Sequence, residues 1–124
     1  MTGITFDTGA LIALERRRQR IKEVVERALQ RDQAITVPAD VVAEWWQGRT
    51  DLRDIILERV DIEPLTESLA KLAGEALGAV RGATLVDAIV MASAAARGDV
   101  VYSSDVEDLE KLRHYFPGVR VLAV

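Results

Sequence analysis

The sequence predicts an α/β fold built on a mainly parallel sheet. Short apolar runs that stop at an acid, a proline or a turn recur along the chain, and helical segments separate them. Such alternation is typical of parallel sheets, because parallel neighbours need a crossover connection. The chain has 124 residues, of which 49% are hydrophobic and 29% charged. This size and balance suit one core, so we expect residues 1–124 to form a single domain.

Five segments have the length and composition of short strands. They are residues 4–6, 35–37, 60–65, 100–102 and 119–122. Pro38 ends the second segment, and Pro64 makes the third an edge strand, because proline cannot donate a hydrogen bond to a neighbouring strand. Helices are expected over residues 8–15, 21–29, 41–46, 51–58, 69–80, 84–98 and 106–115. Gly48 is expected to end one helix and Thr50 to cap the next.

The composition excludes several kinds of chemistry. Cysteine is missing from the sequence, which excludes disulfide bonds, thiolate zinc sites and thiol nucleophiles. The single histidine, His114, cannot build a site of several imidazoles. The net charge of −4 argues against bulk attraction to nucleic acid but is compatible with a nuclease, because bound cations reverse the sign of an acidic site. With neither a signal-peptide pattern nor an apolar run near the ~18 residues that span a bilayer, we expect a cytoplasmic protein that does not bind membranes.

The opening stretch, residues 4–14, places an acid at the end of a strand. The apolar run over residues 4–6 stops at Asp7, and a helical pattern begins immediately after it. In open α/β folds, ligands bind at the carboxyl edge of the sheet, where such a residue lies. Thr8 is expected to cap the helix through its hydroxyl, and Gly9 to relax the backbone at the turn. The alternative is that Asp7 only starts a turn.

A second acid, Glu44, lies inside the helix that follows the second strand. It shares a helix face with Asp40, but Asp40 lies in the first turn, where a carboxylate suits the helix dipole without further function. Glu44 has apolar neighbours, so it either faces solvent or binds a ligand. Trp45 and Trp46 point about 100° apart, so one of them is a candidate for an interface with another chain, and the alternative is that it shields the edge of the core.

A third acid, Asp87, lies in a helix that is apolar on almost every side and is closed by Gly98. This pattern predicts a buried helix. Thr84 and Asp87 have the spacing of a capping box, in which the acid serves only the helix start. The functional alternative is a carboxylate directed into a shared site, because a buried carboxylate without a partner would have to bind a cation or a proton.

The fourth strand repeats the opening pattern, because it runs into Ser103, Ser104 and Asp105 before a helix. Here too there is a structural alternative, since Ser104 and Glu107 have the spacing of a capping box. Asp108, in the first turn of that helix, is a weaker candidate for a site.

Together, these placements predict one acidic pocket at the carboxyl edge of the sheet. Its members are Asp7, Glu44, Asp87 and Asp105. Four carboxylates that lie close together cannot all be ionised without cations. Oxygen ligands without cysteine or a histidine cluster favour Mg²⁺ or Mn²⁺. Because such ions activate water and stabilise a phosphodiester under attack, the pocket predicts phosphodiester hydrolysis.

Four arginines lie between the first two predicted helices, at Arg16, Arg17, Arg18 and Arg20. They form either a solvated connector or a contact with a phosphate backbone.

Two stretches resemble the motifs of PIN-domain nucleases. Residues 4–14 resemble the opening of that family, an apolar strand followed by Asp, then Ser or Thr, any residue, and Ala. Residues 87–105 resemble its second half, in which an Asp-Ala helix precedes a strand that ends in Thr or Ser, any residue, and Asp. Length and spacing are similar to those of VapC, the toxin of bacterial toxin–antitoxin pairs, over essentially the whole chain. Met91 stands where a small residue is more usual, and Gly9 is permitted but not distinctive.

The resemblance implies a PIN-like nuclease domain over residues 1–124, with a parallel five-stranded sheet and helices on both sides. It implies a Mg²⁺- or Mn²⁺-dependent endoribonuclease toxin that cleaves RNA, forms a homodimer and has a VapB-type antitoxin that covers or fills the pocket. The metal ligands that it assigns are Asp7, Glu44, Asp87 and Asp105. The residues expected to support them are Thr8, Ser103 and Asp108.

Three other functions are compatible with parts of the sequence. Residues 7–9, Asp-Thr-Gly, are the signature of aspartic proteases, in which two Asp share a proton, but that fold is nearly all β. A receiver-like signalling module would accept phosphate on Asp7, but all three lysines lie in predicted helices rather than on a late strand. A Ser–His hydrolase would depend on His114, which lies in the last predicted helix.

Overall fold

The computed structural model describes residues 2–47 and 51–124, and its elements follow the predicted order. The strands are β1 (Ile4–Phe6), β2 (Ile35–Pro38), β3 (Asp61–Glu63), β4 (Val100–Ser103) and β5 (Val121–Ala123). The helices are α1 (Thr8–Glu15), α2 (Gln19–Gln30), α3 (Ala39–Trp45), α4 (Asp51–Leu57), α5 (Glu67–Ala79), α6 (Leu85–Arg97), α7 (Val106–Glu110) and the 3₁₀ helix η1 (Lys111–His114). Gly48 and Thr50 lie outside the described residues. Within the described ranges, no helix is long and apolar enough to cross a membrane.

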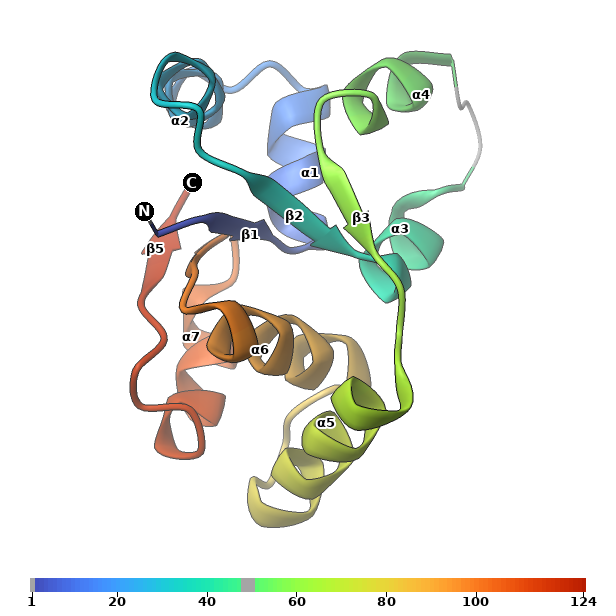
Figure 1. The fold of residues 1–124 in the computed structure, drawn as a ribbon, viewed down its shortest axis with the longest axis vertical. Coiled ribbons are helices and arrows are strands. Elements are labelled where there is room, and N and C mark those ends of the chain that lie inside the picture. The colour runs from blue at the N-terminus through green and yellow to red at the C-terminus, as the bar shows by residue number, and fades with distance from the viewer. Residues whose placement is uncertain (1, 48–50) are drawn as a thin grey trace.

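The five strands form one sheet in the order β3-β2-β1-β4-β5, and every pairing is parallel. Figure 1 shows α1, α2 and α4 on one face of the sheet and α5, α6 and α7 on the other. These observations confirm the predicted fold class. They exclude the nearly all-β protease fold, because a helix begins directly after Asp7. They also exclude a receiver domain, whose strand order is 2-1-3-4-5.

The boundaries of the last elements and of β3 differ from the predictions. β3 ends one residue before Pro64, yet it pairs only with β2, so the predicted edge position is confirmed. The last predicted helix is split into α7 and the tighter η1. β5 starts later than expected, because the chain turns at Pro117, where the backbone N–H of Val119 donates to Phe116 O at 3.2 Å.

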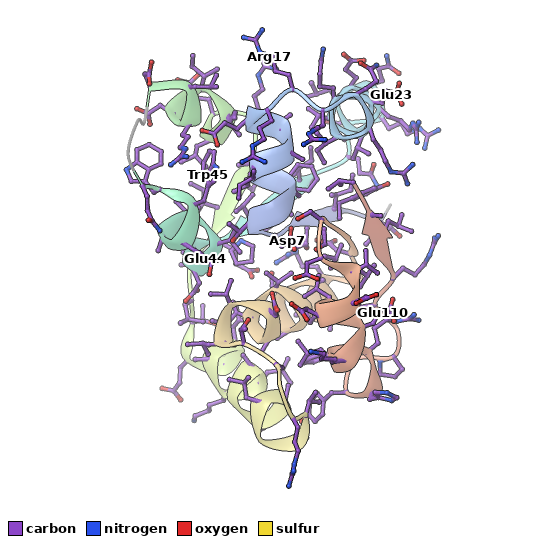
Figure 2. All side chains as sticks on the ribbon, turned by 180° about the vertical axis from the view of Figure 1, so that it is seen from behind. Asp7, Arg17, Glu23, Glu44, Trp45 and Glu110 are labelled. Carbon is purple, nitrogen blue, oxygen red and sulfur yellow. The ribbon has the colours of Figure 1, made fainter. Side chains whose placement is uncertain are left out.

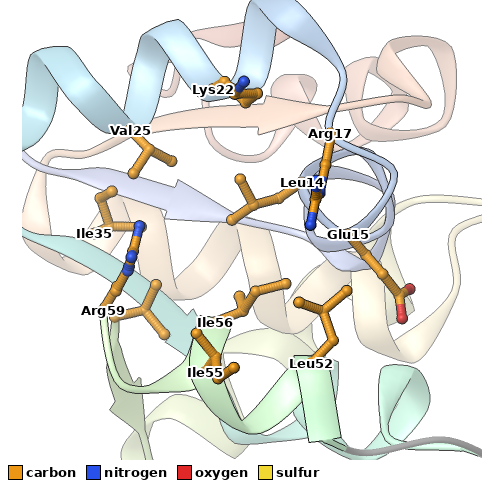
Figure 3. A pocket seen from close by; sticks show the side chains of 11 residues that line it. Leu14, Glu15, Arg17, Lys22, Val25, Ile35, Leu52, Ile55, Ile56 and Arg59 are labelled. Atoms are coloured by element: carbon orange, nitrogen blue, oxygen red, sulfur yellow. The ribbon is translucent and has the colours of Figure 1, made fainter.

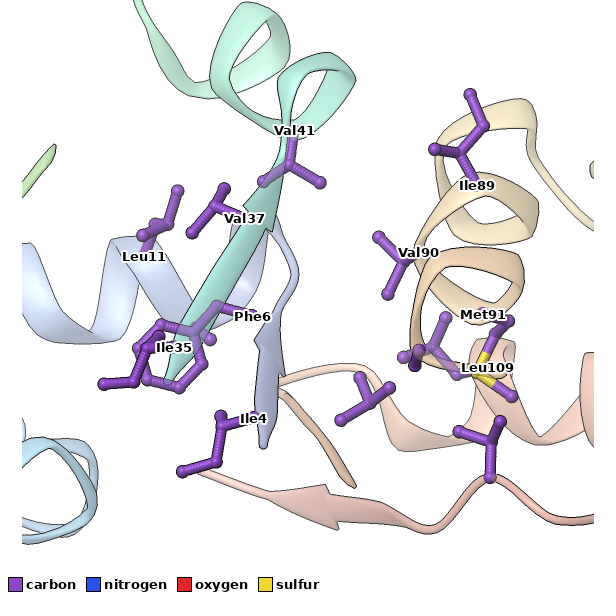
Figure 4. Packing of buried hydrophobic residues seen from close by; sticks show 14 of the residues in the cluster. Ile4, Phe6, Leu11, Ile35, Val37, Val41, Ile89, Val90, Met91 and Leu109 are labelled. Carbon is purple, nitrogen blue, oxygen red and sulfur yellow. The ribbon is translucent and has the colours of Figure 1, made fainter. Parts of the chain in front are cut away.

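The aliphatic core fills both faces of the sheet. Figure 4 shows Phe6, Leu11 and Val37 on the side of α1, and Val90 and Met91 on the opposite side, on α6. All five side chains are fully buried. β1 is the middle strand and is covered on both faces, which explains why its three residues are all buried. The core therefore fixes the strand whose end carries Asp7.

α6 is the buried helix that the sequence predicts. Its residues 88–94 are all buried. Thr84 caps it, because its Oγ1 accepts a hydrogen bond from the backbone N–H of Asp87 at 3.2 Å. Gly98 ends the helix with φ 76°, a left-handed conformation that glycine adopts without strain. The position of Asp87 is thus set by a helix that is fixed at both ends.

A polar network fastens the far end of α6 to the sheet. Arg97 Nε donates to Asp99 Oδ2 at 2.9 Å. Arg97 Nη2 donates to Thr5 Oγ1 at 2.8 Å and to Ser93 Oγ at 2.7 Å. Glu63 on β3 accepts hydrogen bonds from both Arg97 and Ser93. Because the charged groups are paired, they can lie against the sheet at a reduced desolvation cost, and they join β1 and β3 to α6.

Candidate active site at the carboxyl edge of the sheet

Four separate segments carry the predicted acids toward one edge of the sheet. Asp7 directly follows β1, and Glu44 lies on α3, which follows β2. Asp87 lies in the first turn of α6, and Asp105 lies just beyond the end of β4. Figure 2 shows Asp7 at the start of α1 and Glu44 on the neighbouring α3. The parallel sheet therefore gathers residues that are far apart in the sequence.

Asp7 is only 6% exposed and is held by two hydrogen bonds. Its Oδ1 accepts from the backbone N–H of Ala10 at 2.9 Å, so Asp7 itself caps α1. Its Oδ2 accepts from the hydroxyl of Ser103 at 2.5 Å. The prediction that Thr8 caps this helix is wrong, because Thr8 is the first helical residue and its hydroxyl has another partner.

That partner is Glu44. Thr8 Oγ1 donates to Glu44 Oε1 at 2.5 Å, which joins the start of α1 to α3. Glu44 is exposed, so its carboxylate can reach a ligand in the pocket. The tryptophans next to it differ: Trp45 is buried, with the Arg53 guanidinium 5.3 Å from its ring centroid, and Trp46 is half-buried. Only Trp46 is therefore accessible for the predicted interface.

Ser103 connects two of the acids. Its side chain is fully buried, and its Oγ both donates to Asp7 and accepts from the backbone N–H of Asp105 at 2.8 Å. One hydroxyl thus fixes the ends of β1 and β4 relative to each other. The capping role considered for Ser104 is not found, because Asp105 is the residue before α7 and no side-chain cap is seen there among the described residues.

Asp105 and Asp108 form a hydrogen-bonded pair of carboxyl groups. This hydrogen bond raises the pKa of Asp105. The same bond, together with Lys111, lowers the pKa of Asp108. Lys111 Nζ lies 3.2 Å from Asp108 Oδ1. Asp108 therefore lies against Asp105, where a supporting residue is predicted.

Burial raises the pKa of Asp7 to about 6. The hydrogen bonds from Ser103 and Ala10 act in the opposite direction, since they stabilise the carboxylate. The charges of Asp87 and Asp105 contribute to this increase, so the three acids lie within electrostatic reach of one another. Ionising Asp7 therefore costs more free energy than ionising a solvated carboxyl group, and a nearby cation would offset that cost.

Asp87 has a similar environment. Burial is the main cause that raises its pKa, and a hydrogen bond with Thr84 lowers it. The charges of Asp108, Asp105 and Glu44 add to the increase. Asp87 therefore lies within electrostatic reach both of Asp105 and Asp108, which follow β4, and of Glu44 on α3. A catalytic role of Asp87 is compatible with its contacts at the helix start, because Thr84 accepts from its backbone N–H and a carboxylate can accept several contacts.

The donor atoms fit a hard divalent cation, although they do not form a closed ligand set. Within residues 2–47 and 51–124, no three acidic or histidine side chains are arranged as a metal-binding group. Glu44 is bonded to Thr8, and Asp105 to Asp108. The donors are carboxylate oxygens, which Mg²⁺ and Mn²⁺ prefer, and a cation would cancel the repulsion that raises the pKa of Asp7.

Gly9 has a role that the sequence did not reveal. A Cβ at this position would lie 1.9 Å from Ser104 Oγ. Glycine is therefore needed because the turn after β4 approaches α1 closely, and not because the backbone needs extra freedom, since Gly9 lies within a regular helix. Nothing in the local pattern could signal this contact, because the two residues lie near opposite ends of the chain.

Comparisons with known proteins agree with this architecture. The sequence matches the family model of the PIN domain over residues 4–114, and none of the curated proteins matches it significantly. The chain resembles one in the crystal structure of VapBC2 from Rickettsia felis bound to a promoter DNA fragment, with a TM-score of 0.78, 13% identity and 98% of each chain covered. It also resembles one in DNA-bound VapBC from Salmonella typhimurium, with a TM-score of 0.77, 14% identity and coverage of 99% and 98%.

A toxin–antitoxin complex from Klebsiella pneumoniae contains a further similar chain, with a TM-score of 0.70, 18% identity, and 97% of this chain and 96% of that chain covered. At these identities the solved structures establish a shared fold. The family match is stronger, because it spans both motifs and all four candidate acids. The protein therefore belongs to the PIN-domain family, whose members are nucleases.

Proposed function

We propose that this protein is a Mg²⁺- or Mn²⁺-dependent endoribonuclease that hydrolyses RNA phosphodiester bonds, with residues 1–124 as one nuclease domain. The observation that carries the proposal is the convergence of four acids on one sheet edge, where burial and repulsion raise the pKa of Asp7 and Asp87. Groups whose ionisation is costly in a shared site are candidates for catalysis. The PIN-domain match supports nuclease chemistry.

We assign the metal to Asp7, Glu44, Asp87 and Asp105. When bound, the ion supplies activated water and stabilises the charge that develops on the phosphodiester. Asp7 offers a fixed ligand, because each carboxylate oxygen can accept a further contact beside its present hydrogen bond. Glu44 and Asp105 are exposed, so they can turn toward the ion from their present partners.

Three further residues hold these ligands. Ser103 fixes Asp7 through its buried hydroxyl. Thr8 holds Glu44 on the pocket side of α3. Asp108 interacts with Asp105, and the contact with Lys111 favours the ionised form of Asp108. Such supporting contacts tune the affinity of a metal site by fixing its ligands.

The test is digestion of total RNA by the purified protein in Mg²⁺, in Mn²⁺ and in EDTA, followed by mapping of the cut ends. We expect cleavage that needs a divalent ion and is lost in Asp7→Asn, with an unchanged circular dichroism spectrum. Asp61→Asn is the matched control. It makes the same chemical change outside the pocket, because Asp61 is exposed on β3. Full activity in EDTA, or in Asp7→Asn, refutes the proposed site.

We further propose that the enzyme is the VapC-type toxin of a type II pair and that a VapB-type antitoxin inhibits it. The similar solved structures are toxin–antitoxin complexes. A groove of about 320 Å³ beside α1, α2 and α4 offers an apolar surface for such a partner (Figure 3). Its apolar lining includes Leu14, Val25, Ile35, Leu52, Ile55, Ile56 and Val60. α1 connects its N-cap, Asp7, with Leu14 near its other end, so one partner can contact both the candidate acids and the groove.

Binding to the small protein encoded beside this gene tests the partner. Ile55 is 52% exposed, so Ile55→Asp should weaken the complex strongly without unfolding the toxin. Leu29→Asp is the control, because Leu29 is 61% exposed on α2 and does not line the groove. Equal affinity of the two variants contradicts the groove as the antitoxin site.

A homodimer and a cytoplasmic location complete the proposal. The accessible Trp46 supports a contact with another chain. Light scattering of the purified protein tests the dimer, and a monomer mass at tens of micromolar protein contradicts it. Cell fractionation tests the location.

A further inference from the structure

The four arginines between α1 and α2 face two different surfaces. Arg16, Arg18 and Arg20 line a hollow of about 590 Å³. Arg17 instead lines the apolar groove beside α4. Arg17 has φ 56°, a left-handed conformation in the connection between α1 and α2, and it lines a different surface from Arg16 and Arg18. The cluster that the sequence presents as one unit is therefore three arginines on one surface and one on another.

Two residues in the lining of the hollow are close in sequence to the candidate acids Asp7 and Asp105. Its lining also contains Gly9 and Ser104. Gly9 lies in the first turn of α1, two residues after Asp7, and Ser104 lies between Ser103 and Asp105. Gly9 and Ser104 approach each other closely, so this side of the hollow adjoins the segments that carry Asp7 and Asp105.

The arginines of the hollow are available for an anionic ligand. Arg20 Nε donates to Ala123 O at 2.6 Å, which fixes one guanidinium at the wall. Arg16 and Arg18 are exposed, and among the described residues the ion pairs of arginine involve Arg53, Arg97 and Arg113 instead. A concentration of positive charge on a chain of net charge −4 marks a local surface for anions.

We propose that this hollow binds the phosphates of the RNA strand next to the bond that is cleaved. The inference rests on the proposed function, because it assigns where the RNA substrate runs after it leaves the candidate acids. A nuclease whose pocket is acidic needs a separate basic surface to hold a polyanion, and guanidinium groups suit phosphate oxygens. Contacts of this kind add affinity without sequence preference and are sensitive to salt. Operator DNA and an acidic segment of the antitoxin are the competing ligands. RNA is favoured over both, because only the substrate must extend from the cleavage site onto the adjoining surface.

The test compares two double variants. The first is Arg16→Gln/Arg18→Gln, and the control is Arg27→Gln/Arg31→Gln, which removes the same charge from exposed positions at the end of α2. The probe is a single-stranded 2′-O-methyl RNA, which the enzyme cannot cut, titrated in EDTA over a range of salt. Each phosphate contact contributes roughly 0.7 to the slope of log affinity against log salt, so the first variant should lose about 1.4 and the control nothing. Turnover of a dinucleotide, which is too short to reach the hollow, should be the same in both variants, whereas KM for long RNA should rise only in the first.

Equal salt slopes for the two variants overturn the inference. The inference is also overturned if Arg16→Gln/Arg18→Gln weakens binding of operator DNA or of the antitoxin but leaves RNA binding unchanged. Metal-dependent cleavage with equal slopes refutes the hollow and leaves the nuclease intact. RNA binding that depends on Arg16 and Arg18, without cleavage in any metal, supports the hollow and refutes the proposed reaction.

Discussion

Ser103 donates a 2.5 Å hydrogen bond to Asp7, and this contact joins the ends of β1 and β4 at the candidate active site. The same hydroxyl accepts from the backbone of Asp105, so one buried oxygen fixes the positions of two acids. The pocket therefore depends on a neutral residue as much as on its carboxylates.

Ser103→Ala should lower RNA cleavage about 10- to 100-fold, as expected for loss of a residue that supports a metal ligand. The buried Asp7 Oδ2 would lose its donor, which should cost about 1–3 kcal/mol of folding free energy. The pKa of Asp7 should also rise, because the hydrogen bond that lowers it is removed. Activity against pH and urea denaturation measure these effects. Ser104→Ala is the matched control, and an equal loss of activity there contradicts the role of Ser103.

Asp7→Asn should stabilise the metal-free protein at neutral pH. Burial raises the pKa of Asp7 from 3.8 to about 6 in the folded protein, so the fold prefers the protonated acid. This contribution to stability is fully present below pH 4 and is lost as pH rises through 6, and it amounts to at most about 3 kcal/mol. Urea denaturation in EDTA at pH 4.5 and 7.5 should show a clearly larger gain for the variant at the higher pH. A gain that is the same at both values contradicts the raised pKa.

Mg²⁺ or Mn²⁺ should raise the melting temperature of the wild-type protein. Binding to the folded state alone adds about 2.7 kcal/mol when the ion is at 100 times its dissociation constant. The ion must displace protons from Asp7 and Asp87, whose pKa values are raised, so binding should weaken as pH falls below 6. Thermal denaturation with and without the ion measures this shift. Asp7→Asn should abolish it and Asp61→Asn should retain it; an undiminished shift in Asp7→Asn removes Asp7 from the metal site.

Thr8→Val should lower activity without unfolding the protein, because it removes the hydrogen bond to Glu44 and keeps the shape of the side chain. Glu44→Gln should lower activity more, because it removes the ligand itself. If Thr8 acts only through Glu44, the double variant should be no worse than Glu44→Gln alone. Cleavage rates of the three variants measure the coupling, and strictly additive losses give Thr8 an independent role.

Gly9→Ala should destabilise the protein by about 1–3 kcal/mol, although alanine favours helices over glycine. The added Cβ would lie 1.9 Å from Ser104 Oγ. Adding Ser104→Ala should restore part of the loss, since it removes the nearest atom. Urea denaturation of the single and double variants tests this, and a stabilised Gly9→Ala variant contradicts the contact.

The fold class could be predicted from the sequence alone, and so could the choice of Asp7, Asp87 and Asp105 as candidate site residues. Apolar runs and helical periodicity are local, so they predicted five strands with helices between them, and the parallel order followed from their alternation. Asp7 and Asp105 could be found because each directly ends a strand, and parallel strands bring such ends to one edge. Asp87 could be found because it is the only acid in an apolar helix.

Only the tertiary structure decided how these residues work together. The cap of α1 by Asp7 is a local contact with Ala10, but the bond between Ser103 and Asp7 joins residues 96 positions apart, so no local pattern could reveal that Asp7 is held from β4. The four arginines are divided between two surfaces in the connection where Arg17 is left-handed, and the need for Gly9 depends on Ser104. Local periodicity fixes which segments are strands and helices, whereas pKa shifts, close contacts and surface charge arise when chain folding brings distant segments together.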